Sequence, residues 1–162
     1  MLNGAMYGAY LLGSGPAKLS HKSHFTASPN TNFESLFLFH FSHTSLLQFL
    51  FTSAAFYTIG NYHVAAYGCT HFAALFGASA LGGSLLTGIG LKSGRTDIYQ
   101  AGAMAPAAGL ITYHVFRNPG WFKGMFRPLP LLTALALYGA FYNDRAAIGG
   151  IGAGFLAFVL GI

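Results

Sequence analysis

Three polar side chains in an otherwise apolar stretch are the first candidates for chemistry in this chain. His43, Gln48 and Thr52 lie five and four residues apart, which places them on roughly one face of a helix. A polar stripe in a helix that spans a membrane is directed towards protein or water rather than towards lipid. The stripe therefore predicts either a polar site or hydrogen bonding between helices, worth about 1 kcal/mol or less per bond.

The other reactive side chains favour packing over catalysis or metal binding. His21 and His24 are three residues apart, but no third ligand is near in sequence, and a metal site needs three or four. For His71 a hydrogen bond within a helix bundle is a better interpretation than haem ligation. The single Cys69 excludes a disulfide framework within the chain, and its apolar surroundings favour a packing role. We therefore expect no metal and no organic cofactor.

The composition predicts an integral membrane protein. Of the 162 residues, 54% are hydrophobic and only 7% are charged, with a mean hydropathy of +0.52. A soluble domain would have about a quarter charged residues. The net charge of +5 arises mostly from cations between apolar blocks, which suits lipid headgroups and does not indicate nucleic-acid binding. The length predicts a single domain over residues 1–162.

Six apolar segments predict an all-α, polytopic membrane bundle. The first is shorter than the roughly 20 residues that a span needs, so we interpret it as a truncated or half-inserted helix. It lacks the features of a secretory signal or an organelle transit peptide. The expected segments are Met1–Leu12, Phe33–Gly60, Val64–Leu91, Ile98–Phe116, Leu129–Tyr142 and Ala146–Ile162, joined by a polar connector over residues 13–32 and by turns at Asn61–His63, Lys92–Asp97 and Asn143–Arg145.

The stretch Ala101–Tyr113 is expected to lie in the centre of the bundle. It is rich in glycine and alanine, and such short side chains let neighbouring helices approach closely. Pro106 is tolerated there because neighbours in a membrane bundle satisfy the freed backbone groups. Gly150 and Gly154 form a GxxxG pair in the last segment, which predicts close contact with this stretch.

A basic and aromatic loop, Arg117–Pro128, is expected at a membrane surface. Trp121 lies among Arg117, Lys123 and Arg127, and tryptophan beside cations suits the headgroup layer. We therefore expect an anionic phospholipid such as cardiolipin to dock at these residues.

The run His24–Phe49 resembles the first loop and second helix of the rhomboid intramembrane serine proteases. It is most similar to their mitochondrial branch, the presenilin-associated rhomboid-like proteins. In that family the second helix carries a histidine, a second histidine five residues later and an asparagine four residues beyond, which together stabilise the oxyanion. Here these positions are His43, Gln48 and Thr52, so one of the three is kept. The matching features are Phe25-Thr26, Ser28-Pro29, Phe41-Ser42-His43 and Ser45-Leu46.

The catalytic pair of the family falls here on residues without proton chemistry. The fourth helix of the family carries Gly-x-Ser-Gly with a nucleophilic serine, and the corresponding tetrad, Gly102-Ala103-Met104-Ala105, has Met104 at the serine. The last helix of the family carries the base before a run of small residues, and Ala147 stands at that histidine. The resemblance thus implies a rhomboid-like six-helix bundle that is not an enzyme.

The resemblance implies a structural or assembly role. We expect a non-catalytic membrane subunit of a mitochondrial inner-membrane complex, either a respiratory complex or an ATP synthase, whose partners are lipids and other transmembrane subunits. The first alternative is a free-standing pseudoprotease that binds transmembrane clients without cutting them. The second alternative, with the least support, is an active intramembrane serine protease of altered mechanism.

Overall fold

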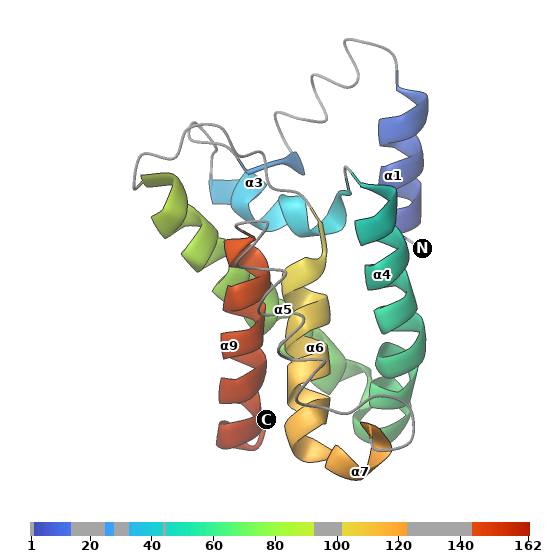
Figure 1. The fold of residues 1–162 in the computed structure, drawn as a ribbon, viewed down its shortest axis with the longest axis vertical. Coiled ribbons are helices and arrows are strands. Elements are labelled where there is room, and N and C mark those ends of the chain that lie inside the picture. Colours follow the sequence, from blue (N-terminus) through green and yellow to red (C-terminus); the bar gives the residue numbers. More distant parts are fainter. Residues whose placement is uncertain (1, 14–24, 28–32, 44, 93–101, 123–143) are drawn as a thin grey trace.

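The regular elements of the fold are helices, as the sequence predicts. The computed structural model describes residues 2–13, 25–27, 33–43, 45–92, 102–122 and 144–162. Within these ranges α6 runs through the middle, α9 and α4 flank it, and α5 passes behind it (Figure 1). The elements are α1 (Leu2–Leu12), α3 (Phe33–Leu38), the 3-10 helix η1 (Phe39–Phe41), α4 (Leu46–Ala55), the π-helix η2 (Phe56–Gly60), α5 (Asn61–Lys92), α6 (Met104–Arg117), α7 (Pro119–Phe122) and α9 (Arg145–Leu160).

The centre of the fold is a set of helices that touch through their backbones. A Cβ atom at Gly150 of α9 would lie 2.7 Å from the Cα of Ala105 on α6, and a Cβ at Gly154 would overlap the backbone of Gly109. Residues 102–115 are all buried. The prediction of a slim central helix in contact with the GxxxG pair is therefore confirmed.

The expected second span, Phe33–Gly60, is wrong as a single helix. The helical turn η1 ends at Phe41 and α4 begins at Leu46, and between them Ser42 (φ −111°, ψ 154°) and Ser45 (φ −121°, ψ 132°) are extended. Serine hydroxyls bond to nearby backbone groups, so serines favour helix ends over helix interiors. Because of this break, α3 and η1 lie across the end of the bundle where α4 and α6 begin (Figure 1).

The turn expected at Asn61–His63 is also wrong, because the chain stays helical there and reverses only at Gly68. Gly68 has φ 87° and ψ 165°, a conformation that glycine adopts without strain. The reversal brings ring nitrogens of His63 and His71 within 2.8 Å, whereas a straight helix would separate these residues by about 12 Å. α4, η2 and the first part of α5 thus form one arm of a helical hairpin, and the rest of α5 forms the other.

One helical stretch among the described residues, Leu46–Leu91, is long and apolar enough to cross a membrane. Gly68 divides it into two arms of roughly 20 residues, which is the length that a single span needs. Arg145–Leu160 is a shorter apolar helix.

The fourth helix begins later than expected. α6 starts at Met104 rather than at Ile98, because Gly102 just before it has φ 129° and donates its N–H to the carbonyl of Phe39 at 2.9 Å. Residues 98–101 and the expected fifth span, Leu129–Tyr142, lie outside the described part of the chain.

The last helix agrees closely with its expected bounds. The carboxylate of Asp144 accepts a hydrogen bond from the backbone N–H of Ala147 at 3.1 Å, which fixes the start of α9. Cys69, for which a packing role rather than a reactive one was expected, is exposed directly after the reversal at Gly68.

Candidate functional site

The candidate site lies where η1, α4 and α6 meet, and His43 is at its centre. His43 is fully buried in the extended link before α4 rather than on a helix. Its Nε2 atom lies 2.9 Å from the Thr52 hydroxyl and 3.4 Å from the backbone nitrogen of Ala103. Its Nδ1 atom is buried without a hydrogen-bond partner among the described residues. The imidazole therefore lies between α4 and the residue before α6.

Thr52 and Gln48 complete the polar part of the site from α4. The Thr52 hydroxyl is buried and lies 2.9 Å from the backbone carbonyl of Gln48, to which it donates. The Gln48 side chain lies directly over Gly102, where a Cβ would come within 2.6 Å of its Oε1 atom. Gln48 thus fills the space above the start of α6, and only a glycine fits beneath it.

Met104 and Ala147 form the apolar side of the site. Met104 is the first residue of α6 and is 3% exposed, and Ala147 on α9 is fully buried in the same apolar cluster. The neighbouring contact between Ala105 and Gly150 holds the two helices at this distance. The structure thus joins His43 to Thr52 and to Ala103, the residue before Met104, and it places Met104 and Ala147 in one apolar cluster.

The chemical capacity of these five side chains is narrow. Nucleophilic catalysis needs a hydroxyl, thiol or amine beside a base. A thioether at Met104 and a methyl group at Ala147 provide neither, and the Thr52 hydroxyl already donates to a backbone carbonyl. The arrangement suits hydrogen bonding that fixes the chain at this end of the bundle.

A serine–histidine contact that the sequence reasoning did not single out lies nearby. The Nε2 atom of the fully buried His40 is 2.8 Å from the carbonyl of Ala80 and 3.1 Å from the Ser84 hydroxyl. Because a carbonyl only accepts, Nε2 carries the proton and does not act as a base towards Ser84. The Ser84 hydroxyl in turn donates to the carbonyl of Leu36. This contact therefore ties α3 and η1 to α5 without forming a nucleophile–base pair.

The residues expected to bind lipid are described only in part. Arg117 is the last residue of α6 and is exposed, and Trp121 lies in α7. Lys123 and Arg127 lie outside the described residues. Lipid binding at this end of the bundle stays a prediction.

Histidines at the opposite end of the bundle are the main feature that the sequence reasoning missed. His63 is hydrogen-bonded to both His71 and His114, which confirms the expected hydrogen bond of His71 within the bundle. The spacing of eight residues between His63 and His71 gave no reason to pair them on one helix, since only the reversal at Gly68 brings them together. In the described part of the chain, no group of three His, Cys, Asp or Glu side chains could hold a metal ion.

Comparison with known families agrees with the resemblance seen in the sequence. Residues 30–162 match the rhomboid domain family, and this match includes α3, the α4–α5 hairpin, α6 and α9. The chain therefore belongs to the rhomboid domain family and is a membrane protein. None of the curated proteins matches this chain.

Proposed function

We propose that this chain is a non-catalytic rhomboid-like membrane subunit with a structural role in a mitochondrial inner-membrane complex. The observation that carries the proposal is the buried thioether of Met104 at the first position of α6, in the same apolar cluster as Ala147 and directly after Ala103, whose backbone nitrogen lies 3.4 Å from His43. The family resemblance puts the nucleophile at Met104 and the base at Ala147, and neither side chain exchanges a proton. The six-span topology and the relation to the mitochondrial presenilin-associated branch belong to the same proposal.

Side chains of the protein itself occupy the site, which favours a scaffold role over binding of transmembrane clients. Gln48 covers Gly102, and His43 is hydrogen-bonded to Thr52, so the chain itself occupies the polar groups that a substrate backbone would need. A client would have to displace the Gln48 amide before its backbone reached the start of α6. This cost disfavours the free-standing pseudoprotease.

The surface of the bundle supports contact with other membrane subunits or lipid. Long apolar side chains are exposed on α4, α5 and α9, where a water-soluble surface would be polar. Arg117 adds a cation at the end of α6, where the expected cardiolipin headgroup would bind. The exposed apolar side chains include Leu46, Leu47 and Leu50 on α4, Leu81, Leu85 and Ile89 on α5, and Phe155, Leu156 and Val159 on α9.

The assembly role is tested by native gel electrophoresis of membranes from cells that express the tagged full chain. We expect stoichiometric migration with a large complex of the respiratory chain or with ATP synthase, together with loss of that complex when the chain is depleted. Migration of the chain alone, with transient crosslinks to single-span proteins, would instead identify the pseudoprotease.

The absence of peptidase activity is tested separately with a fluorophosphonate probe, which labels nucleophilic serines. We expect no labelling of the wild-type chain. The double variant Met104→Ser, Ala147→His restores the two side chains of the family pair and provides a matched control for access of the probe. Labelling of the wild-type chain that a serine-directed inhibitor prevents would refute the non-catalytic assignment.

A further inference from the structure

Three imidazoles and an amide form a continuous hydrogen-bonded chain at the α7 end of the bundle. The Nδ1 atom of His71 lies 2.8 Å from Nε2 of His63, and Nδ1 of His63 lies 2.8 Å from Nε2 of His114. The Nδ1 atom of His114 lies 3.2 Å from the amide nitrogen of Asn118. His63 and His71 come from the two arms of the hairpin, whereas His114 and Asn118 come from α6 and the residue that ends it.

The amide of Asn118 fixes the direction in which each hydrogen bond of this row is donated. An amide nitrogen only donates, so Nδ1 of His114 accepts and its Nε2 carries the proton. Nε2 of His114 therefore donates to Nδ1 of His63, and Nε2 of His63 then donates to Nδ1 of His71. Three neutral imidazoles in the same tautomer satisfy every bond of the chain.

The hydrogen-bonded row of imidazoles is buried in its middle and more accessible at its two ends. His63 and His114 are fully buried, whereas His71 at one end and Asn118 at the other are half-buried. The Asn118 amide also donates to the Tyr67 hydroxyl at 3.3 Å. Accessible ends joined through a buried middle are what proton exchange between two sites requires.

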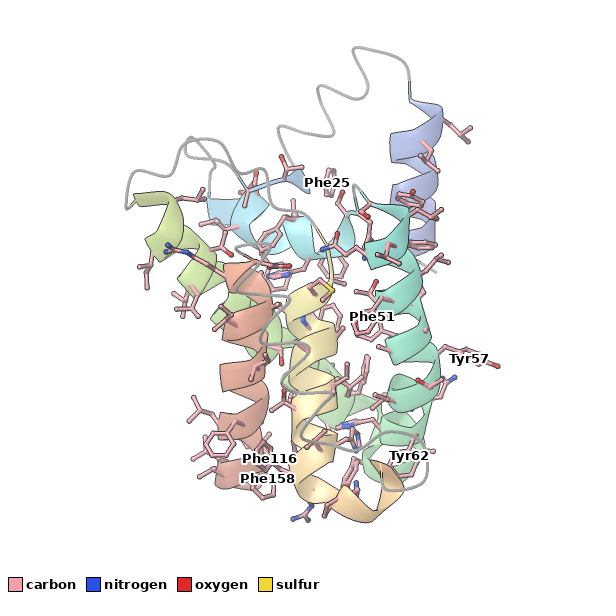
Figure 2. All side chains as sticks on the ribbon, viewed as in Figure 1. Phe25, Phe51, Tyr57, Tyr62, Phe116 and Phe158 are labelled. Carbon is pink, nitrogen blue, oxygen red and sulfur yellow. The ribbon has the colours of Figure 1, made fainter. Side chains whose placement is uncertain are left out.

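The surroundings of the chain are aromatic and contain few charges. The ring of Tyr62 lies 5.4 Å from that of His114, and Figure 2 shows Tyr62 at the α7 end of the bundle. Tyr67 and Tyr113 pack against the imidazoles from α5 and α6. Arg117 is the charged side chain near this end among the described residues, one turn beyond Tyr113.

A metal ion does not explain this cluster. His63 lies in the middle and uses its two ring nitrogens towards two different neighbours. These nitrogens point away from each other, so one nitrogen from each of the three rings cannot face a common centre.

We propose that His114, His63 and His71 form a proton relay. A proton enters at Nδ1 of His114, the N–H protons of His114 and His63 each move to the next imidazole, and one proton leaves from Nε2 of His71. One proton enters and one leaves, and every imidazole changes from the Nε2–H to the Nδ1–H tautomer. Asn118 is the positioning residue of the relay, because its amide must rotate and present its oxygen before His114 accepts the proton.

The relay is tested through the tautomer of His71, measured by nitrogen-15 NMR of the full chain in detergent with labelled histidine. In the wild type we expect the Nε2–H tautomer at His71 and scalar couplings across both N–H···N bonds. Asn118→Asp replaces the donor by an acceptor, so we expect all three imidazoles to reverse to the Nδ1–H tautomer. The His63→Phe variant interrupts the chain, and in that background Asn118→Asp should leave His71 unchanged.

Two results would overturn the proposal. The first is a tautomer of His71 that does not respond to Asn118→Asp when the far-UV spectrum shows the helices intact. The second, measured on the wild type and therefore independent of variant folding, is hydrogen exchange at the ring of His63 more than about tenfold slower than at His71. If the hydrogen bonds were only structural, burial would protect the ring proton of His63 from exchange. In a relay, the ring proton of His63 exchanges as fast as that of His71 at the end.

Discussion

Replacing Gly150 by alanine should loosen the contact between α9 and α6. The added Cβ would lie 2.7 Å from the Cα of Ala105 and closer still to its carbonyl oxygen. Carbon atoms pack at about 3.5–4.0 Å, so the two helices must separate by roughly 1 Å at this point. Overpacking of this kind costs about 1–3 kcal/mol.

The substitution also stabilises the helix itself, and the same substitution at a neighbouring glycine measures that effect alone. Alanine is favoured over glycine in a helix by about 0.5–1 kcal/mol, so the net loss at Gly150 should be about 1–2 kcal/mol. Gly152 lies two residues further along α9, and a Cβ added there would meet no atom within 4 Å, so Gly152→Ala keeps only the favourable part. We expect Gly152→Ala to stabilise the chain by about 0.5–1 kcal/mol.

The comparison is made by equilibrium unfolding of the two variants and the wild type in mixed detergent micelles, followed by far-UV circular dichroism. The expected difference between Gly150→Ala and Gly152→Ala in the free energy of unfolding is about 2 kcal/mol, from the overpacking cost alone. Equal changes in the two variants would show that α9 does not touch α6 at Gly150, and the account of the central packing would then be wrong.

Three further substitutions probe other parts of the fold by the same unfolding measurement. Gly68→Ala should cost about 1–3 kcal/mol because of its φ of 87°, and an unchanged free energy of unfolding would contradict the reversal at this residue. Ser79→Ala should stabilise the chain by about 1 kcal/mol, since the buried hydroxyl lacks a hydrogen-bond partner in the described part of the chain; a loss of stability would reveal a partner. Burial outweighs the hydrogen bonds from the Ala147 and Ala146 backbone and raises the pKa of the Asp144 carboxyl, so its neutral form is favoured in the folded state and stability should fall as pH rises through that pKa. Asp144→Asn should remove this dependence, and an unchanged pH profile would contradict the burial of Asp144.

The parts of the fold that the sequence predicts well are those fixed by residue size. Gly150 and Gly154 repeat every four residues, and Ala105 and Gly109 repeat in the same way on α6, so their contact follows from helical geometry alone. The break at Ser42 was missed, although Ser42, His43 and Ser45 interrupt the apolar residues there, and the reversal was placed at the polar Asn61–His63 rather than at Gly68. A glycine inside an apolar helix looks like a packing residue until its φ is known.

The candidate site was predictable as a set of residues but not as a geometry. The resemblance identified His43, Gln48 and Thr52, and their spacing indicated one helix face. The structure instead places His43 in an extended link before α4, where its imidazole reaches Thr52 from outside the helix. The contact of Gln48 with Gly102 was not predictable, because it depends on the positive φ of Gly102, shortly before α6 begins.

The two polar clusters of the molecule should respond to substitutions independently. His43 lies beside Ala103, directly before α6. His114 lies ten residues beyond Met104, the first residue of that helix, which is a separation of about 15 Å. Most residues between them are apolar, and Ala105 and Gly109 pack on glycines of α9. No hydrogen bond among those described links the two ends. Effects of substitutions at this separation usually add, so removing the imidazole of His43 should leave the tautomer of His71 unchanged. A response of His71 would mean that α6 moves as a rigid rod, because only a shift of the whole helix could carry the change between the two ends.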